Sequence, residues 1–164
     1  MARPGRPRKA DPKAESLSWL IRDHDDEAAK KLLLEIGVDA QDGYARTALL
    51  WSVVHQNEEI SAWLVAHKAN LNHQDRNGYT ALHFAAQGRR GIAAHLLFEN
   101  GADPNVADSH GNIPLWTAII NSKGDWELVK LYLAKGANPD SINRYQNTPR
   151  RLATETFNVN LEDL

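Results

Sequence analysis

The chain has 164 residues, a formal net charge of −2, and 42% hydrophobic and 24% charged residues, a balance typical of a single soluble globular domain. It contains no cysteine, which excludes disulfide bonds, thiolate zinc sites and cysteine nucleophiles. Because no apolar run reaches the roughly 18 residues of a membrane helix and no secretory signal is visible, we expect a protein of the cytoplasm, or of the nucleus in a eukaryote, without membrane association.

The basic residues are concentrated at the start of the chain. Residues 1–13 carry five Lys or Arg residues against a single Asp, a net charge of +4, so the rest of the chain carries −6. A segment of prolines and charges without apolar side chains cannot offset the entropy lost on ordering. We therefore predict that residues 1–14 form a disordered basic arm and that the folded domain begins at residue 15.

Internal repetition dominates the remainder of the chain. Thr47, Thr80 and Ile113 are spaced by 33 residues, and Thr148 follows 35 residues later. Each block is typical of two short helices, with apolar residues three and four apart, joined by turns rich in Gly, Asn and Asp. A period of this length indicates helical units that bury a core only by stacking against their neighbours.

The central block resembles a known motif. Residues 75–86 read D-R-N-G-Y-T-A-L-H-F-A-A, and residues 96–105 contain L-L followed by G-A-D-P-N. This is similar to the ankyrin repeat, D-x-x-G-x-T-P-L-H-x-A-A and then L-L-x-x-G-A-D-x-N, which implies an all-α solenoid of stacked helix-turn-helix units with hairpin-like loops. We predict a domain over residues 15–158, with a C-terminal tail at 159–164. Its five repeats, of which the first and last are polar caps, are expected at 15–41, 42–74, 75–107, 108–142 and 143–158.

Six positions carry local structural predictions. His83 stands at the motif histidine, where we expect its ring to make a structural hydrogen bond at the helix start, and Thr80 is the expected N-cap of that helix. Ala45 and Gln146 replace glycines at turns that need a positive φ, so we expect those two turns to be distorted. Two tryptophans are expected at inward-facing core positions, Trp51 and Trp63.

No catalytic or metal-binding pattern is present. The seven histidines include no H-E-x-x-H or similar pair that would place two ligands on one helical face. Arg89 and Arg90 are flanked by glycines, but the segment lacks the order of a phosphate-binding loop and is expected to be a turn between helices. We therefore expect a protein that is not an enzyme and that needs no cofactor or metal.

The resemblance implies that partners bind at the hairpin tips and along the exposed side of the first helix of each repeat. Tyr and Arg are enriched in interface hot spots, and three of the four tyrosines fall at these positions. The alternative is that the tips are solvated turns in which polar residues are simply common. Trp116 is either a packed substitute for the motif histidine or an exposed anchor. The predicted partner-binding residues are Tyr44, Arg46, His55, Arg76, Asn77, Tyr79, Gln87, His110, Asn112, Trp116, Arg144 and Tyr145.

Two functional hypotheses follow. The leading one is a non-catalytic protein–protein interaction module, monomeric alone, that binds one partner protein through its concave face, and that in a bacterium would serve as an inhibitor or immunity protein by analogy. The alternative is a DNA-associated adaptor, because the arm resembles the Gly-Arg-Pro core of an AT-hook, which enters the narrow minor groove of A·T-rich DNA. A plain disordered tail and a nuclear localisation signal are the other interpretations of the arm. The DNA-binding residues would be Arg3, Arg6, Arg8 and Lys9.

Overall fold

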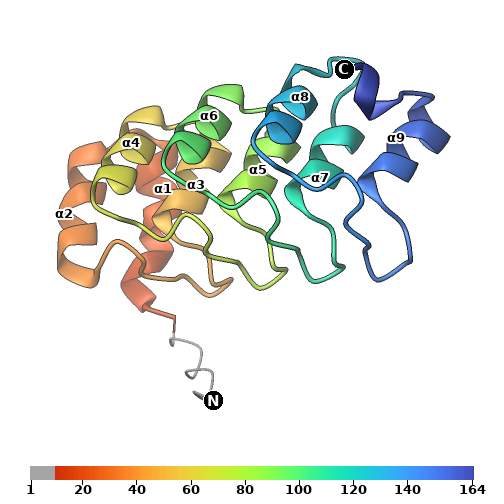
Figure 1. The fold of residues 1–164 in the computed structure, drawn as a ribbon. Coiled ribbons are helices and arrows are strands. Elements are labelled where there is room, and N and C mark those ends of the chain that lie inside the picture. The colour runs from red at the N-terminus through yellow and green to blue at the C-terminus, as the bar shows by residue number, and fades with distance from the viewer. Residues whose placement is uncertain (1–9) are drawn as a thin grey trace.

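The computed structural model describes residues 10–164, which form a row of helical pairs (Figure 1). Within this range the chain contains α-helices and short 3₁₀-helices joined by turns, and no strand. In chain order the elements are η1 (Pro12–Ser16), α1 (Leu17–Arg22), α2 (Asp26–Ile36), α3 (Ala48–His55), α4 (Glu58–Ala66), α5 (Ala81–Gly88), α6 (Gly91–Glu99), α7 (Pro114–Ile120), α8 (Glu127–Ala134), α9 (Pro149–Phe157) and η2 (Leu161–Asp163).

The helices form two layers. The inner layer consists of α1, α3, α5, α7 and α9, each of which packs against the next, and in the outer layer α2, α4 and α6 follow one another in the same way. Each outer helix also packs on the inner helix that precedes it. This order confirms the predicted all-α solenoid of stacked helix-turn-helix units.

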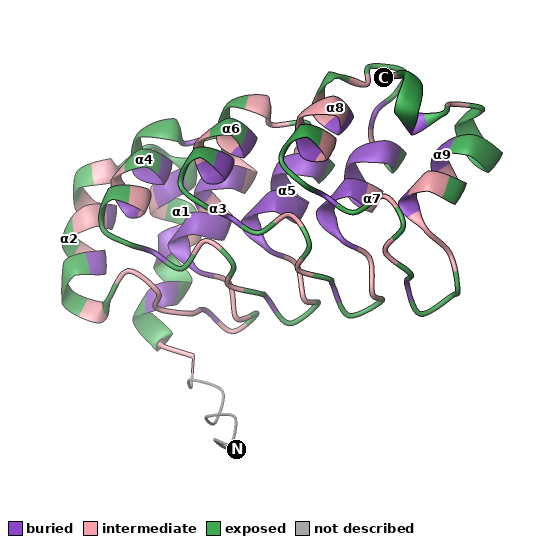
Figure 2. Ribbon diagram, viewed as in Figure 1, coloured by how far each residue is buried: buried purple, intermediate pink, exposed green. Residues whose placement is uncertain are grey.

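The core lies where the inner helices meet the outer layer and each other (Figure 2). Equivalent positions in successive repeats fill equivalent places, and Leu49, Leu82 and Leu115 are all at most 1% exposed. Burying each of these side chains contributes about 1.5–3 kcal/mol. Trp51 and Trp63, expected in the core, are instead half-buried and pack against its edge.

Each hairpin tip is closed by one buried polar side chain. Asp42 Oδ1 accepts hydrogen bonds from the backbone N–H groups of Tyr44 and Arg46, both at 2.8 Å. Asp75, Asp108 and Asn143 do the same with the residues two and four positions further on, at 2.8–3.0 Å. All four side chains are buried. The tips therefore share one backbone conformation, although their exposed residues differ.

Neighbouring tips are joined by backbone hydrogen bonds. Arg76 N–H donates to the carbonyl of Tyr44 at 3.0 Å, and Ser109 N–H donates to the carbonyl of Asn77 at 2.9 Å. Gly78 has φ +80°, and a Cβ there would lie 2.7 Å from the backbone nitrogen of Ser109. This position therefore requires glycine for both its backbone conformation and its close approach to the next tip.

The turns at Ala45 and Gln146 are not distorted, which corrects the sequence prediction. Both residues have φ 57°, the left-handed conformation. Ala45 N–H donates to the Asp42 carbonyl at 3.0 Å, as Gly78 N–H does to the Asp75 carbonyl at 2.9 Å. We call the buried side chain that closes each tip (Asp42, Asp75, Asp108 or Asn143) its polar clamp. The polar clamp and the neighbouring tips hold Ala45 and Gln146 in a conformation that costs a non-glycine residue about 1–2 kcal/mol.

His83 links two repeats through both of its ring nitrogens. Thr80, the N-cap of α5, donates its backbone N–H to His83 Nδ1 at 3.1 Å, and His83 Nε2 lies 3.0 Å from the carbonyl oxygen of Asn112. Because Nδ1 accepts, the neutral ring carries its proton on Nε2 and donates it to that carbonyl. Burial lowers the pKa of His83. The predicted structural hydrogen bond at the helix start is confirmed.

The N-terminal end of the domain begins earlier than predicted. Asp11 N–H donates to the carbonyl of Gln41 at 2.9 Å, and Ala14 is 1% exposed. Glu15 accepts a hydrogen bond at 2.6 Å from the backbone N–H of Gly43. Residues 11–14 thus belong to the packed cap rather than to the arm, because the side chain of Ala14 joins the core. The proposed DNA-binding residues Arg3, Arg6, Arg8 and Lys9 lie outside the described residues.

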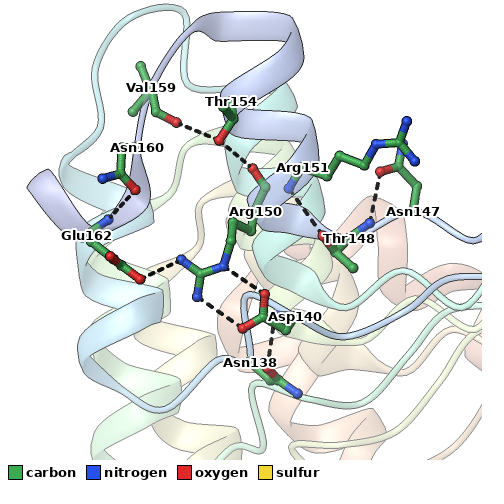
Figure 3. Close-up of polar contacts among 10 residues, drawn as sticks. All are labelled: Asn138, Asp140, Asn147, Thr148, Arg150, Arg151, Thr154, Val159, Asn160 and Glu162. Carbon is green, nitrogen blue, oxygen red and sulfur yellow. Dashed lines mark hydrogen bonds and ion pairs between the residues drawn. The ribbon is translucent and has the colours of Figure 1, made fainter.

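Residues 159–164 form a second cap, where a tail was predicted (Figure 3). The Arg150 guanidinium donates to both carboxylate oxygens of Asp140, at 2.7 and 3.0 Å, and to Glu162 at 2.9 Å. Leu161 is 6% exposed and belongs to the core. These contacts fold the segment back onto α9.

No helix in residues 10–164 has the length and apolar character needed to cross a membrane.

The left-handed conformation of Ala45 generates a stability prediction. Replacing Ala45 with Gly removes the strain at φ 57° but adds the backbone entropy of glycine, so we expect the free energy of unfolding to rise by up to about 1 kcal/mol. Urea denaturation measures the change. Gly78→Ala is the matched control and should lose stability, because its Cβ meets the next tip. An Ala45→Gly variant less stable than the wild type would contradict this account.

The buried ring of His83 generates a pH prediction. The pKa of this histidine is near 6.5 in the unfolded chain and lower in the folded protein. Below pH 6.5 the unfolded state therefore binds more protons than the folded state, and the free energy of unfolding decreases as the pH is lowered. Above pH 6.5 the neutral His83 ring makes its full contribution to the free energy of unfolding. In His83→Gln we expect lower stability at pH 7.5 and a shallower decline between pH 7.5 and 5.5, both measured by urea denaturation.

The matched control is His55→Gln, because burial lowers the pKa of that less buried histidine as well. This variant should keep most of the decline with pH. A His83→Gln variant with the same pH slope as the wild type would show that the histidine does not limit stability in acid.

Candidate functional site

The hairpin tips line up along one edge of the solenoid, at the bottom of Figure 1. We call the tip residues 43–46, 76–79, 109–112 and 144–147 the tip surface. One row of residues crosses the tip surface, and each of them lies two positions after a polar clamp. These residues differ in size and chemistry. The row consists of Tyr44, Asn77, His110 and Tyr145, all of them exposed.

Two tyrosines mark opposite ends of this row. The exposed fractions of Tyr44 and Tyr145 are 63% and 72%, although aromatic residues are usually more buried. Tyr145 Oη lies 3.3 Å from His110 Nδ1, and the two rings are stacked with centroids 6.2 Å apart. The Tyr145 ring is therefore oriented by the neighbouring tip, and it presents a large contact area with few conformations to lose on binding.

Arg46 is held by its surroundings instead of extending freely into solvent. Its Nε lies 3.4 Å from the buried Asp75 carboxylate. Its guanidinium lies over the rings of Trp51, Phe84 and Tyr44, at 4.7, 5.2 and 5.8 Å from their centroids. Cation–π contacts of this kind contribute about 0.5–2 kcal/mol. The structure thus places this predicted binding residue between the second and third repeats.

Tyr79 adjoins this cluster. Its ring stacks on His83 with centroids 4.9 Å apart and meets the edge of Phe84 at 5.6 Å. Burial raises the pKa of Tyr79, so the hydroxyl remains a neutral donor and acceptor at physiological pH. Tyr44, Arg46 and Tyr79 therefore form one patch, which only the assembled second and third repeats create.

The outward charges of the tip surface are positive. The carboxylates of Asp42, Asp75 and Asp108 are buried and accept backbone N–H groups. The exposed charged side chains are those of Arg76 and Arg144, at equivalent positions of the third and fifth repeats. A partner therefore meets guanidinium donors, phenol rings and amide groups, the side-chain types that recur in interface hot spots.

The remaining predicted residues lie on the inner helices. His55, at the end of α3, stacks on Trp51 with centroids 5.5 Å apart, and burial lowers its pKa. Gln87 is exposed near the end of α5. Trp116 on α7 is half-buried, and Asn112 is half-buried with its carbonyl engaged by His83. Trp116 is thus neither a fully packed substitute nor a fully exposed anchor.

Three exposed apolar side chains on the inner helices were absent from the sequence prediction: Trp19, Ile120 and, at the end of α9, Phe157, which is 36% exposed. Trp19 on α1 is 59% exposed, with the Arg22 guanidinium 4.8 Å from its ring centroid, and it occupies the position of Trp51 in α3. Ile120, one turn after Trp116, is 50% exposed. The spacing of 32 residues between Trp19 and Trp51 is the sequence signal, which the degenerate first repeat obscures.

No group of three or more His, Asp or Glu side chains within residues 10–164 is arranged to hold a metal ion. The tip surface instead combines aromatic area, hydrogen-bond donors and a fixed backbone. Its chemistry suits the recognition of another macromolecule.

Comparisons with known proteins agree with the fold. A model of three ankyrin repeats matches residues 17–108, and a model of a single ankyrin repeat matches residues 110–144. A putative ankyrin repeat-containing protein of Treponema pallidum is 35% identical over 111 residues, which are 66% of this chain and 37% of that protein. Human ankyrin repeat and KH domain-containing protein 1 is 31% identical over 103 residues, 63% of this chain and 4% of that protein.

A neurogenic locus notch homolog protein 1 of Danio rerio is 39% identical over 92 residues, 55% of this chain and 4% of that protein. The chain thus spans well under half the length of these relatives. Ankyrin repeats are typically non-catalytic modules that bind other proteins. Because the model of three repeats alone matches more than half of it, the chain belongs to the ankyrin-repeat family.

Proposed function

We propose that the chain is a non-catalytic scaffold that binds one partner protein through the tip surface and the adjoining exposed side of the inner helices. The observation that carries this proposal is the pair of exposed rings, Tyr44 and Tyr145, on tips whose backbone is clamped from within. A solvated turn has no need of large aromatic groups in that position, so the tyrosines favour recognition over simple solvation.

The rigidity of the tips supports the same proposal. Each tip is held by its polar clamp and by hydrogen bonds to its neighbours, so binding costs little backbone entropy. Loops that are fixed on a rigid scaffold and differ in their exposed residues are a common basis of specific recognition. An inhibitor or immunity role in a bacterium, and a cytoplasmic location, stay predictions that the tip surface is compatible with.

The tip tyrosines provide the direct test of binding. We expect a specific partner from an extract of the source organism to be retained by the wild type and lost by the double variant Tyr44→Ala, Tyr145→Ala. Titration calorimetry with that partner should show a loss of affinity on the order of tenfold or more, because hot-spot residues cost at least about 2 kcal/mol when truncated.

The control for this experiment is Lys31→Ala, an exposed residue of α2 on the outer layer. It should bind like the wild type. Both tyrosines are exposed and each has one ring contact, so thermal unfolding of the double variant should fall only slightly below that of the wild type. Equal affinity of the double variant and the wild type would place the binding surface elsewhere.

The basic arm is tested separately by deleting residues 2–9, which removes Arg3, Arg6, Arg8 and Lys9 and leaves the packed residues 11–14 intact. On the scaffold proposal the partner affinity of the deletion variant is unchanged. Binding to A·T-rich duplex DNA, measured by fluorescence anisotropy at several salt concentrations, distinguishes the adaptor hypothesis. Partner binding that disappears with the arm would contradict the role of the tip surface.

A further inference from the structure

The charged side chains are distributed unevenly between the two sides of the solenoid. The outer helices α2, α4, α6 and α8 contain seven Asp or Glu residues and three Lys residues, a net charge of −4. The tip surface contains three Arg residues and no Asp, Glu or Lys, and the central inner helices α3, α5 and α7 contain no Asp, Glu, Lys or Arg. This distribution favours an acidic partner at the tips and disfavours it on the outer layer.

The carboxylates at the bases of the tips are turned inward. The three aspartate clamps, Asp42, Asp75 and Asp108, are each at most 7% exposed, and their Oδ1 atoms accept backbone N–H groups. The second oxygen of Asp42 accepts the Trp51 indole N–H at 2.9 Å. That of Asp75 lies 3.4 Å from Nε of Arg46. A partner at the tips therefore meets the arginines and not these carboxylates.

Two of the three tip arginines are available to a partner. Arg76 and Arg144 are exposed, and their guanidinium groups make no hydrogen bond or ion pair within residues 10–164. The clamp beside Arg144 is Asn143, which carries no charge to offset that of the arginine. Both arginines follow a clamp directly, in the third and fifth repeats. Because neighbouring inner helices pack about 8–10 Å apart, their backbone positions are separated by about 20 Å.

The repeat between these arginines presents apolar surface. Its inner helix, α7, carries Trp116, which is half-buried, and Ile120, which is 50% exposed. A partner segment that reaches both arginines has to cross this repeat. Apolar side chains in the middle of the segment would then remove Trp116 and Ile120 from water.

The alternation of the arginines favours a protein over a nucleic acid. The residues equivalent to Arg76 and Arg144 in the second and fourth repeats are Gly43 and Ser109. A nucleic-acid strand carries a phosphate at every nucleotide and is bound by a continuous basic groove. Residues 14–164 also carry a net charge of −6, which opposes the approach of a polyanion.

We propose that the partner binds the tip surface through an acidic segment whose carboxylates contact Arg76 and Arg144. Apolar side chains between those carboxylates contact Trp116 and Ile120. This inference rests on the proposed function, to which it adds the chemistry of the partner. An extended chain covers about 20 Å in about six residues, so the acidic groups are expected about that far apart in the partner sequence. Each guanidinium binds a carboxylate through two N–H groups, which fixes the register of the segment.

The test uses short synthetic peptides that share a central stretch of Leu and Phe residues and carry paired Glu, paired Gln or paired Lys residues at both ends. Each is titrated into the isotopically labelled full chain at low ionic strength. We expect saturable shifts of the Asn77 and Tyr145 amides and of the Trp116 indole N–H with the glutamate peptide, and much weaker shifts with the other two. Equal shifts with the glutamine peptide would overturn the proposal.

The decisive variant is Arg76→Gln, Arg144→Gln, which neutralises two exposed side chains. Its matched control is Lys31→Gln, Lys135→Gln, which changes the net charge equally on exposed residues in and directly after the outer helices. Both variants retain the basic arm, so any contribution of the arm cancels. We expect the arginine variant to bind the glutamate peptide about threefold or more weakly than the control, and the difference to shrink at high salt. Equal affinities would contradict the assigned contacts.

A partner identified by its dependence on Tyr44 and Tyr145 separates this inference from the proposed function. Its affinity should also fall in Arg76→Gln, Arg144→Gln. If it depends on the tyrosines and not on the arginines, the proposed function stands and the acidic segment is wrong. A thymidine oligonucleotide that shifts the tip amides at lower concentration than the glutamate peptide would identify a nucleic-acid ligand and overturn the inference as well.

Discussion

The buried polar side chain at the base of each hairpin tip is the interaction on which the rest of the structure depends. Asp42, Asp75, Asp108 and Asn143 each accept two backbone N–H groups that would otherwise be left without partners in a tight turn. A buried carboxylate is tolerated because these donors replace its hydration. Fixing the turn in this way sets the spacing between tips, and that spacing sets the packing of the helices behind them.

The clamp also separates conformation from exposed chemistry. Since the backbone of each tip is determined from within, the outward residues are free to be Tyr44 in one repeat and His110 in another without a change of shape. It even holds Ala45 and Gln146 in a conformation that normally favours glycine. Some outward residues nevertheless acquire a structural role, as Arg46 does between Asp75 and three aromatic rings.

The interior of the solenoid is uniform, whereas the junctions between repeats differ. At the starts of α2 and α4 the side chains of Asp25 and Asn57 accept a backbone N–H group, whereas Arg90 and Trp126, the N-caps of α6 and α8, make no such hydrogen bond. A polar cleft lies between the third and fourth repeats, and its lining includes Arg90 and Lys123. The tip surface and this cleft occupy different parts of the fold.

The periodicity of 33 residues was sufficient to predict the all-α solenoid, and the motif positions were sufficient to predict the bond made by His83, because both follow from local spacing. The same spacing predicted where the tips lie, but it did not predict which side chains pack around them. The burial of Arg46, the exposure of Trp19 and the packing of Ala14 and Leu161 each depend on residues distant in sequence. The glycine-flanked pair at Arg89 and Arg90 was predicted to be a turn between helices, and it lies between the end of α5 and the start of α6. Sequence by itself thus determined the repeating unit, whose helices and turns are set by local interactions. Only the tertiary structure decided which side chains remain exposed and which are buried between repeats, because burial and pairing are properties of neighbouring repeats together.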